Sequence, residues 1–121
     1  MSDVSLDGHI LTILAPERID GKTALELNAR AVALQRRERP GQATDWLSDM
    51  SQTKSFSFDA RRALMESESL DEVRRYAIVV RSTFVRTVVR FILRAGGQEQ
   101  RTQFFATRQE ALAWLEQPSE E

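Results

Sequence analysis

The stretch Arg75-Tyr76-Ala77-Ile78-Val79-Val80 decides the fold that this sequence predicts. Its last five residues are apolar or aromatic and lack the alternation with polar residues that a half-exposed strand shows. A short, uninterrupted run of this kind is typical of a strand covered on both faces, as in the middle of a parallel sheet. We therefore expect Arg75–Val80 to be a central strand with helices packed on both sides.

Strand patterns also occur before and after this run. We expect strands at His9–Leu14, Thr44–Met50 and Thr102–Ala106 because these segments are short and rich in apolar or β-branched residues. Val4–Leu6 is a candidate hairpin partner for the first of them, with Asp7-Gly8 as the two-residue turn. The segments Ala15–Gly21 and Ser51–Ser57 are predicted to be loops.

Helical patterns separate the strands. Capping boxes begin at Thr23 and Thr107, because each threonine is followed three residues later by a glutamate. The expected helix starts are, in chain order, Thr23, Asp59, Ser82 or Thr83, and Thr107. Pro40-Gly41 and Gly96-Gly97 are expected to end the first and third helices. The alternation predicts a single α/β domain, residues 1–121, with a largely parallel four- to five-stranded sheet and about four helices.

The composition excludes several kinds of active site. The chain has 121 residues, no cysteine and one histidine, His9. Thiolate chemistry is therefore excluded, and one histidine cannot supply a zinc site of the usual kind. The sequence also lacks a P-loop and the glycine-rich dinucleotide motif. We expect no catalytic residue, no metal and no cofactor.

Charge and hydropathy limit the partners. The net charge of −1 argues against general binding of nucleic acid. The longest nearly apolar run, Tyr76–Val80, is far shorter than the roughly 20 residues of a membrane helix. The N-terminus lacks the pattern of a signal peptide. These features lead us to expect a cytoplasmic protein without a membrane span.

Two further segments resemble a known family. They are Asp49-Met50-Ser51, at the end of the second strand, and Phe104-Phe105 followed by the helix Glu110–Leu115. With the order of strands and helices, they resemble the SpoIIAA-like (STAS-type) family from His9 to about Glu116. The resemblance implies a binding or regulatory module instead of an enzyme. It also implies a gross fold shared with lipid-carrying Sec14-type domains.

The chain departs from that family at one functional position. STAS-type antagonists of anti-sigma factors carry a phosphorylatable serine directly after an aspartate, at the start of the helix after strand two. The matching segment here is Phe58-Asp59-Ala60, and alanine has no hydroxyl to phosphorylate. Three loop serines lie nearby and could substitute: Ser51, Ser55 and Ser57.

The third predicted helix carries the strongest candidate site. Arg86, Arg90 and Arg94 recur every four residues and form one cationic stripe. The residues around the stripe are almost all apolar: Phe84, Val85, Val88, Val89, Phe91, Ile92 and Leu93. One core-facing stripe does not need so many, so we expect a second face to bury against a partner. The arginines could hold an acidic protein or a phosphate. The alternative is a solvated edge paired with nearby acids: Glu66, Glu68, Asp71 and Glu72.

Three smaller candidates lie near the ends of the strands. Asp49 falls where open parallel sheets bind ligands, at the carboxyl end of a strand, and it could act with Asp45 as an acid–base pair. The alternative is that Asp49 accepts hydrogen bonds from Ser51 and its neighbours. Phe56 and Phe58 either cap a ligand pocket or pack into the core.

Two functions from different classes remain open at this point. The first is a non-enzymatic module that acts through protein–protein interaction, as a homodimer or with another protein, using the third helix and the loop after strand two. The second is a carrier or sensor of a lipid or another amphipathic anion. The carrier hypothesis requires an apolar pocket beneath the third helix, near Phe56, Phe84 and Val88, with an arginine at its mouth.

Overall fold

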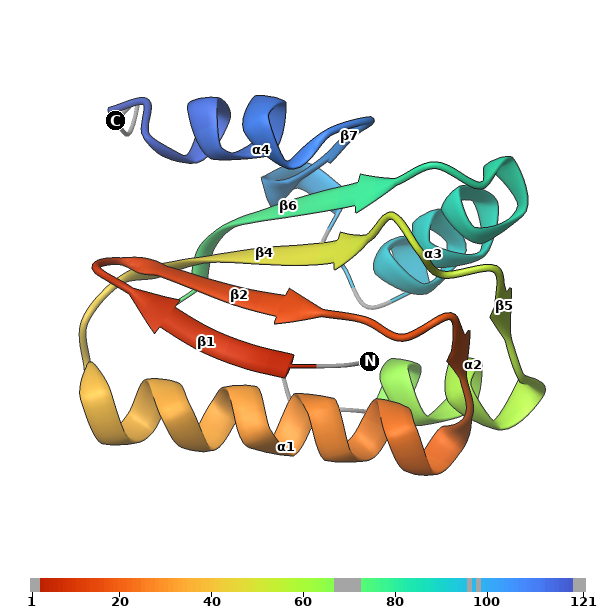
Figure 1. Ribbon diagram of the computed structural model, residues 1–121. Coiled ribbons are helices and arrows are strands. Elements are labelled where there is room, and N and C mark those ends of the chain that lie inside the picture. Colours follow the sequence, from red (N-terminus) through yellow and green to blue (C-terminus); the bar gives the residue numbers. More distant parts are fainter. Residues whose placement is uncertain (1–2, 67–72, 96, 98, 119–121) are drawn as a thin grey trace.

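A five-stranded sheet in the order β1-β2-β4-β6-β7 lies at the centre of the computed structural model (Figure 1). The structure describes residues 3–66, 73–95, 97 and 99–118. The strands are β1 (Asp3–Asp7), β2 (Ile10–Leu14), β4 (Thr44–Met50), β6 (Val73–Val80) and β7 (Thr102–Phe105). β1 pairs with β2 in antiparallel fashion, and the remaining neighbours are parallel. The expected largely parallel sheet is confirmed.

The run that predicted a central strand lies in β6, between β4 and β7. The strand begins two residues earlier than expected, at Val73. Ala77 and Val79 belong to the core on one side of the sheet, and Ile78 and Val80 to the core on the other side. Both faces are covered, as the uninterrupted apolar run predicted.

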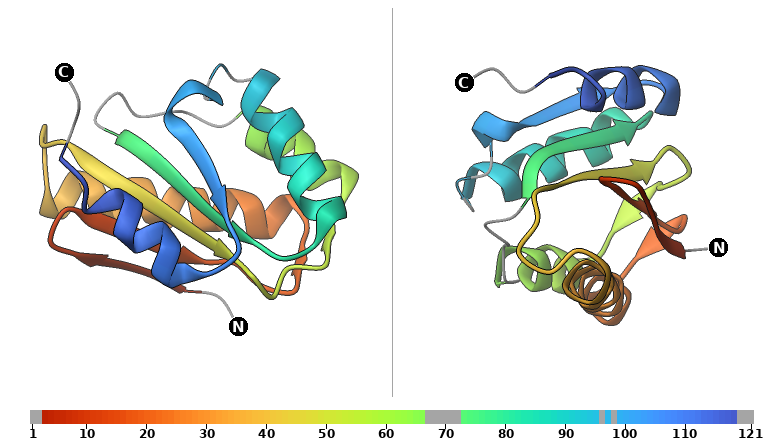
Figure 2. Two further views of the ribbon diagram at one scale, coloured as in Figure 1. Left: turned by 90° about the horizontal axis from the view of Figure 1, so that it is seen from above. Right: turned by 90° about the vertical axis from the view of Figure 1, so that its left-hand side faces the viewer.

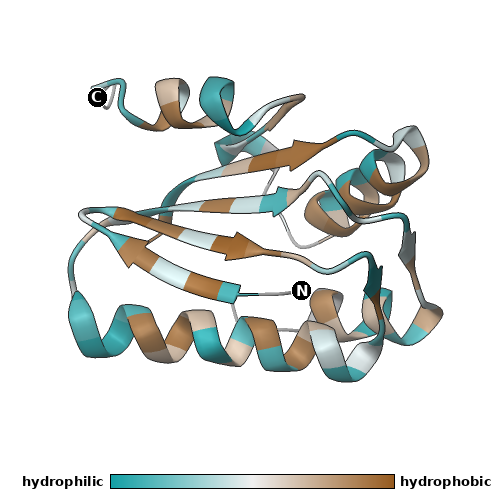
Figure 3. Cartoon of the chain, in the orientation of Figure 1, coloured by the Kyte–Doolittle hydropathy of each residue, from teal (hydrophilic) through white to brown (hydrophobic). Residues whose placement is uncertain are grey.

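Four helices cover the two faces unequally. α1 (Gly21–Glu38), α2 (Phe58–Glu66) and α3 (Thr83–Ala95) lie on one face, and α4 (Arg108–Leu115) lies on the other (Figure 2). A short 3₁₀ turn, Glu99–Arg101, precedes β7. Apolar residues along β2 and β6 lie between these layers (Figure 3). Burial against helices on both sides therefore holds the sheet in the middle of the molecule.

The first hairpin turn and the start of the first helix were predicted wrongly. The hairpin turn is Gly8-His9 instead of Asp7-Gly8, because Asp7 already pairs with Ile10. Gly8 has a φ of +62°, which suits glycine at the first central position of such a turn. α1 begins at Gly21, and its N-cap is Asp20, whose carboxylate accepts a hydrogen bond of 2.8 Å from the backbone N–H of Thr23.

A second, two-stranded parallel sheet lies within the two segments that were predicted to be loops. It consists of β3 (Arg18–Ile19) and β5 (Ser55–Phe56). Ile19 and Phe56 are buried in the core beneath α2 and α3. Two-residue strands are too short to show an alternating pattern, so they could not be predicted from the sequence.

Side-chain caps begin the remaining helices. The Ser57 hydroxyl accepts a hydrogen bond from the Ala60 N–H, so the cap of α2 comes from Ser57 and not from Asp59. The Ser82 hydroxyl accepts from the Val85 N–H at the start of α3, and Thr107 caps α4 as expected. After α3, Gly97 has a φ of +73° and its N–H donates to the Arg94 carbonyl.

We predict that Thr107→Ala destabilises the protein by about 1 kcal/mol, because α4 loses its N-cap. The Thr107 hydroxyl accepts a hydrogen bond from the Glu110 N–H and donates one to the Glu110 carboxylate. Urea denaturation measures the change in the free energy of unfolding. Thr107→Ser keeps the hydroxyl and is the matched control, and equal stability of the two variants would contradict this role.

Candidate functional site

The parallel strands β2, β4 and β6 have their carboxyl ends at the same end of the sheet, close to the start of α2 and α3 (Figure 1). We call this end the carboxyl edge. Asp49, a residue that the sequence singled out, is at this edge and is only 7% exposed. Its Oδ1 accepts a hydrogen bond of 3.0 Å from the Ser51 N–H. The two predicted residues therefore do lie together.

Asp49 has a second partner that the sequence did not reveal. Arg108, the first residue of α4, donates to Asp49 Oδ2 from Nη2 at 2.7 Å and from Nε at 3.0 Å. Fifty-nine residues separate the pair in the chain, so no local spacing indicates it. The ion pair ties the only helix described on this face to the carboxyl edge of the sheet.

The environment of Asp49 keeps its carboxylate ionised. Burial by itself raises the pKa of this group, but hydrogen bonds from Ser51 and Arg108 and the positive charge of Arg108 outweigh it. The pKa of Asp49 is therefore lowered from its ordinary value of 3.8. A carboxylate held in this way is a poor proton donor or acceptor near neutral pH.

The loop after β4 is fixed to the loop after β2. Gln52 donates from Nε2 to the Ala15 carbonyl at 2.8 Å, and the Thr53 hydroxyl donates to the Pro16 carbonyl at 2.8 Å. Phe56 lies in the core, 6% exposed, whereas Phe58 is 74% exposed. The two phenylalanines that the sequence grouped together therefore have different environments.

The position that matches the phosphorylated serine of STAS-type proteins is inaccessible here. Ala60 is fully buried, in the core that lies beneath α2 and α3. The nearby Ser57 hydroxyl already caps α2 through the Ala60 N–H.

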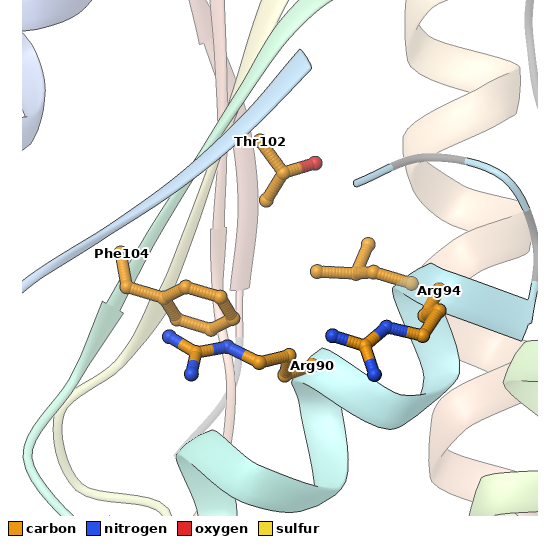
Figure 4. Close-up of a pocket in the computed structure, with 5 residues that line it drawn as sticks. Arg90, Arg94, Thr102 and Phe104 are labelled. Carbon is orange, nitrogen blue, oxygen red and sulfur yellow. The ribbon is translucent and has the colours of Figure 1, made fainter. Parts of the chain in front are cut away.

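The arginine stripe of α3 lies beside the edge strand β7. The guanidinium carbons of Arg86 and Arg90 lie 5.5 Å and 5.2 Å from the centre of the Phe104 ring. Arg90 and Arg94 line a cavity between α3 and β7, together with Leu93, Thr102 and Phe104 (Figure 4). Phe104 thus connects the stripe to the sheet, a role that its position in a short strand did not indicate.

α3 leaves two phenylalanines outside the core. Its buried residues are Val85, Val88, Val89 and Ile92. Phe84 and Phe91 are 54% and 65% exposed. As expected from the sequence, α3 has more apolar residues than its single buried stripe can accommodate.

Phe84 lies on the side of α3 that faces α2. The guanidinium carbon of Arg61, in α2, lies 5.8 Å from the centre of its ring. Since α3 also contacts β7 through Phe104, its two flanks differ, with phenylalanine toward α2 and arginine toward β7.

The acid–base groups of the sheet do not converge. Asp45 lies at the amino end of β4 and forms a bidentate salt bridge with Arg74. Its Oδ2 also lies 3.5 Å from His9 Nε2. Four residues of extended strand separate Asp45 from Asp49, which corresponds to about 13 Å. Carboxyl groups that act together on one glycosidic bond lie within about 10 Å of each other. The geometry does not support the acid–base pair.

Two features of the described residues add to this result. No group of three or more histidine, aspartate or glutamate side chains there could hold a metal ion. No helix in the same part of the chain is both long and apolar enough to cross a membrane. The expected acidic partners of the arginine stripe were Glu66, Glu68, Asp71 and Glu72. The last three lie outside the described residues, and the side chain of Glu66 is not described either.

Comparison with known proteins identifies both a family and a fold. The family model "Domain of unknown function (DUF7793)" matches residues 7–119. Among solved structures, the chain is similar to an uncharacterized protein of the DUF3478 family with a SpoIIAA-like fold from Shewanella loihica PV-4. The two chains are 16% identical with a TM-score of 0.63, and the match covers 95% of this chain and 92% of that one. No curated protein matches. The expected SpoIIAA-like fold is confirmed.

We predict that Arg108→Gln destabilises the protein and shifts its acid unfolding to higher pH. Because the pKa of Asp49 is lowered in the folded state, its ionised form stabilises the fold above pH 3.8, and this stabilisation is lost as the pH falls through the lowered pKa. Removing Arg108 raises that pKa and costs about 2 kcal/mol at neutral pH, the usual range for hydrogen bonds to charged groups.

Chemical denaturation between pH 2 and pH 7 measures this effect. In an Asp49→Asn background, Arg108→Gln should cost much less, because the charge that it stabilised is absent. An acid midpoint that Arg108→Gln leaves unchanged would show that the ion pair does not contribute to stability.

Proposed function

The chain belongs to the DUF7793 family, and from that premise we propose that it is a non-enzymatic module that binds a protein partner through α2 and α3. The observation that carries the proposal is the exposure of three phenylalanines on these helices: Phe58 (74%), Phe84 (54%) and Phe91 (65%). We call them the aromatic surface. Aromatic residues are enriched in protein interfaces, where they supply much of the binding energy.

The aromatic surface is arranged for contact. Phe84 and Phe91 are seven residues apart, which places them on one side of α3 two turns from each other. Arg61 reaches from α2 to the ring of Phe84, so this side of α3 is continuous with α2. A partner that covers it would bury apolar rings beside guanidinium groups.

Charge favours an acidic partner. α3 contains three arginines and no acidic residue, and residues 73–108 contain eight arginines against one acid, Glu99. Among the described residues, no carboxylate forms an ion pair with Arg86 or Arg90. A second copy docked on the aromatic surface would bring the two Arg61 side chains, each over the ring of its own Phe84, close to each other, which is unfavourable. We therefore propose an acidic protein in preference to the homodimer expected from the sequence.

The positions of the acid–base groups support a binding role without catalysis. His9 and Asp45 lie at the amino end of the sheet, whereas Asp49 lies at the carboxyl end and is held ionised by Arg108. A mechanism of acid–base catalysis needs such groups within reach of one substrate. Their separation supports a module that acts by recognition.

The carrier alternative receives little support from the same region. Phe56 and Val88 pack together in the buried core, and Phe84 lies on the surface. These three residues therefore do not line a common apolar pocket beneath α3, which is where an acyl chain was expected. The protein-binding proposal also uses Phe84, but it requires no cavity.

We predict that the double variant Phe84→Ser, Phe91→Ser loses its protein partner and keeps its fold. The two rings are largely exposed, so stability should change by roughly 0.5 kcal/mol or less per substitution. Proteins recovered on immobilised wild-type chain from a lysate of the source organism should be recovered about tenfold less by the variant. Recovery from wild type should also fall as salt is raised, because the arginines contribute by charge.

Leu25→Ser is the matched control. Leu25 is also a large exposed hydrophobic residue, 55% exposed, but it lies on α1. It should recover the same proteins as wild type. If the double variant folds and recovers them equally well, the aromatic surface is not the binding surface.

A further inference from the structure

β1 is an outermost strand of the sheet, and its outer side is open. It pairs with β2 alone, whereas β2 has a neighbouring strand on each side. Figure 2 shows β1 along one border of the sheet. The outer side of such a strand presents backbone N–H and C=O groups that can hydrogen-bond to an added strand. β1 therefore offers a second surface for binding, separate from the aromatic surface.

The register of the hairpin shows which residues carry these backbone groups. Asp7 pairs with β2 across the two-residue turn, and residues that flank such a turn exchange hydrogen bonds with each other. Bonded and non-bonded pairs alternate along an antiparallel ladder, so Ser5 and Asp3 also direct their backbone groups to β2. The N–H and C=O groups of Val4 and Leu6 then point outward. Within the described part of the chain, these two residues have no backbone partner outside the sheet.

The two faces of β1 differ in polarity. Val4 and Leu6 are half-buried, and their side chains pack against the core that α1 covers. Asp3, Ser5 and Asp7 are exposed on the other face. An added strand continues both faces, because successive side chains of a strand point to opposite faces. Its side chains would therefore lie alternately beside apolar residues and beside acidic ones.

The exposed face of β1 favours positive charge in a neighbour. Asp7 forms no ion pair among the described residues. Asp3 lies 3.6 Å from Arg30, but both side chains are more than half exposed, and a pair of this kind contributes little. Opposite charges on adjacent strands stabilise a sheet, whereas like charges directly opposite destabilise it. Two copies joined antiparallel about Ser5 would set Asp3 of each against Asp7 of the other, which disfavours self-association at β1.

We propose that β1 binds an extended segment of another protein as an added strand, and that basic and apolar residues alternate in this segment. Val4 and Leu6 each supply one backbone donor and one acceptor. Lysine or arginine side chains of the segment lie beside Asp3 and Asp7, and its apolar side chains continue the face that packs toward α1. The site goes beyond the proposed function, because it takes a basic segment on β1 and not an acidic partner on α2 and α3.

The probe is a capped heptapeptide in which lysine and valine alternate, titrated into ¹⁵N-labelled protein. We expect saturable amide shifts centred on Val4 and Leu6. Hydrogen exchange adds a sharper readout, because the N–H groups of Val4 and Leu6 should exchange faster than that of Ser5 in the free protein. Saturating peptide should slow their exchange by about tenfold or more. Absence of saturable shifts in β1 at millimolar peptide would overturn the proposal.

A matched peptide separates strand addition from general attraction of cations. It has the same sequence, with every backbone nitrogen methylated, so it keeps all charges and side chains but has no N–H to donate to β1. It should bind about tenfold more weakly or less, as expected for the loss of two or more backbone hydrogen bonds. Equal affinity of the two peptides would show that charge alone attracts them and would contradict an added strand.

Two protein variants test the charge of β1 in the same way. Asp7→Asn should weaken binding of the lysine–valine peptide about two- to fivefold, the usual size of a cross-strand charge pair. Asp59→Asn removes the same charge from an exposed position at the start of α2 and should leave the affinity unchanged. Equal losses in the two variants would contradict a contact at Asp7.

Two further outcomes separate this site from a second copy and from the aromatic surface. Protection of Val4 and Leu6 that grows with protein concentration, without peptide, would overturn the proposal because a second copy would then occupy β1. The Phe84→Ser, Phe91→Ser variant should bind the lysine–valine peptide like wild type. The two proposals can therefore fail separately.

Discussion

A helix that lies on one face of a sheet can bury a single stripe of its side chains, and α3 carries apolar residues beyond that stripe. Val85, Val88, Val89 and Ile92 fill the core against the sheet. The helical period then forces Phe84 and Phe91 to one flank and the arginines to the other. The exposed rings of Phe84 and Phe91 are thus a consequence of how the core is built.

The carboxyl edge of the sheet is occupied by the chain's own groups. In open parallel sheets this edge usually holds the ligand. Here Asp49 is occupied by Arg108 and Ser51, and Gln52 and Thr53 bond to the loop after β2. The chain's own groups satisfy the polar atoms that a substrate would need. What remains for binding are the exposed rings of α3 and the outer side of β1.

Much of this architecture could be predicted from local patterns. β4 has the expected bounds, Thr44–Met50, and β6, whose apolar run marks a buried strand clearly, differs from the prediction by two residues. The start of α1 could not be predicted, since Asp20 and Thr23 are both good N-caps and the sequence does not choose between them. The tight packing of Gly21 against Asp59, where an added Cβ would lie 3.0 Å from the Asp59 Cβ, fits the longer helix. Arg108 and Phe104 were missed as site residues because their partners are distant in the chain, whereas the stripe of Arg86, Arg90 and Arg94 is visible in its spacing alone.

The central claim is that a partner covers the phenylalanines of α3, and photo-crosslinking tests it most directly. A benzophenone amino acid replaces Phe91 in one variant and Leu25, on α1, in another, and the chain is irradiated in living cells. The account predicts an adduct at position 91 to a peptide that is rich in carboxylates and contains apolar residues, with none at position 25. Adducts at position 25 alone, or at position 91 only to a second copy of this chain, would contradict it.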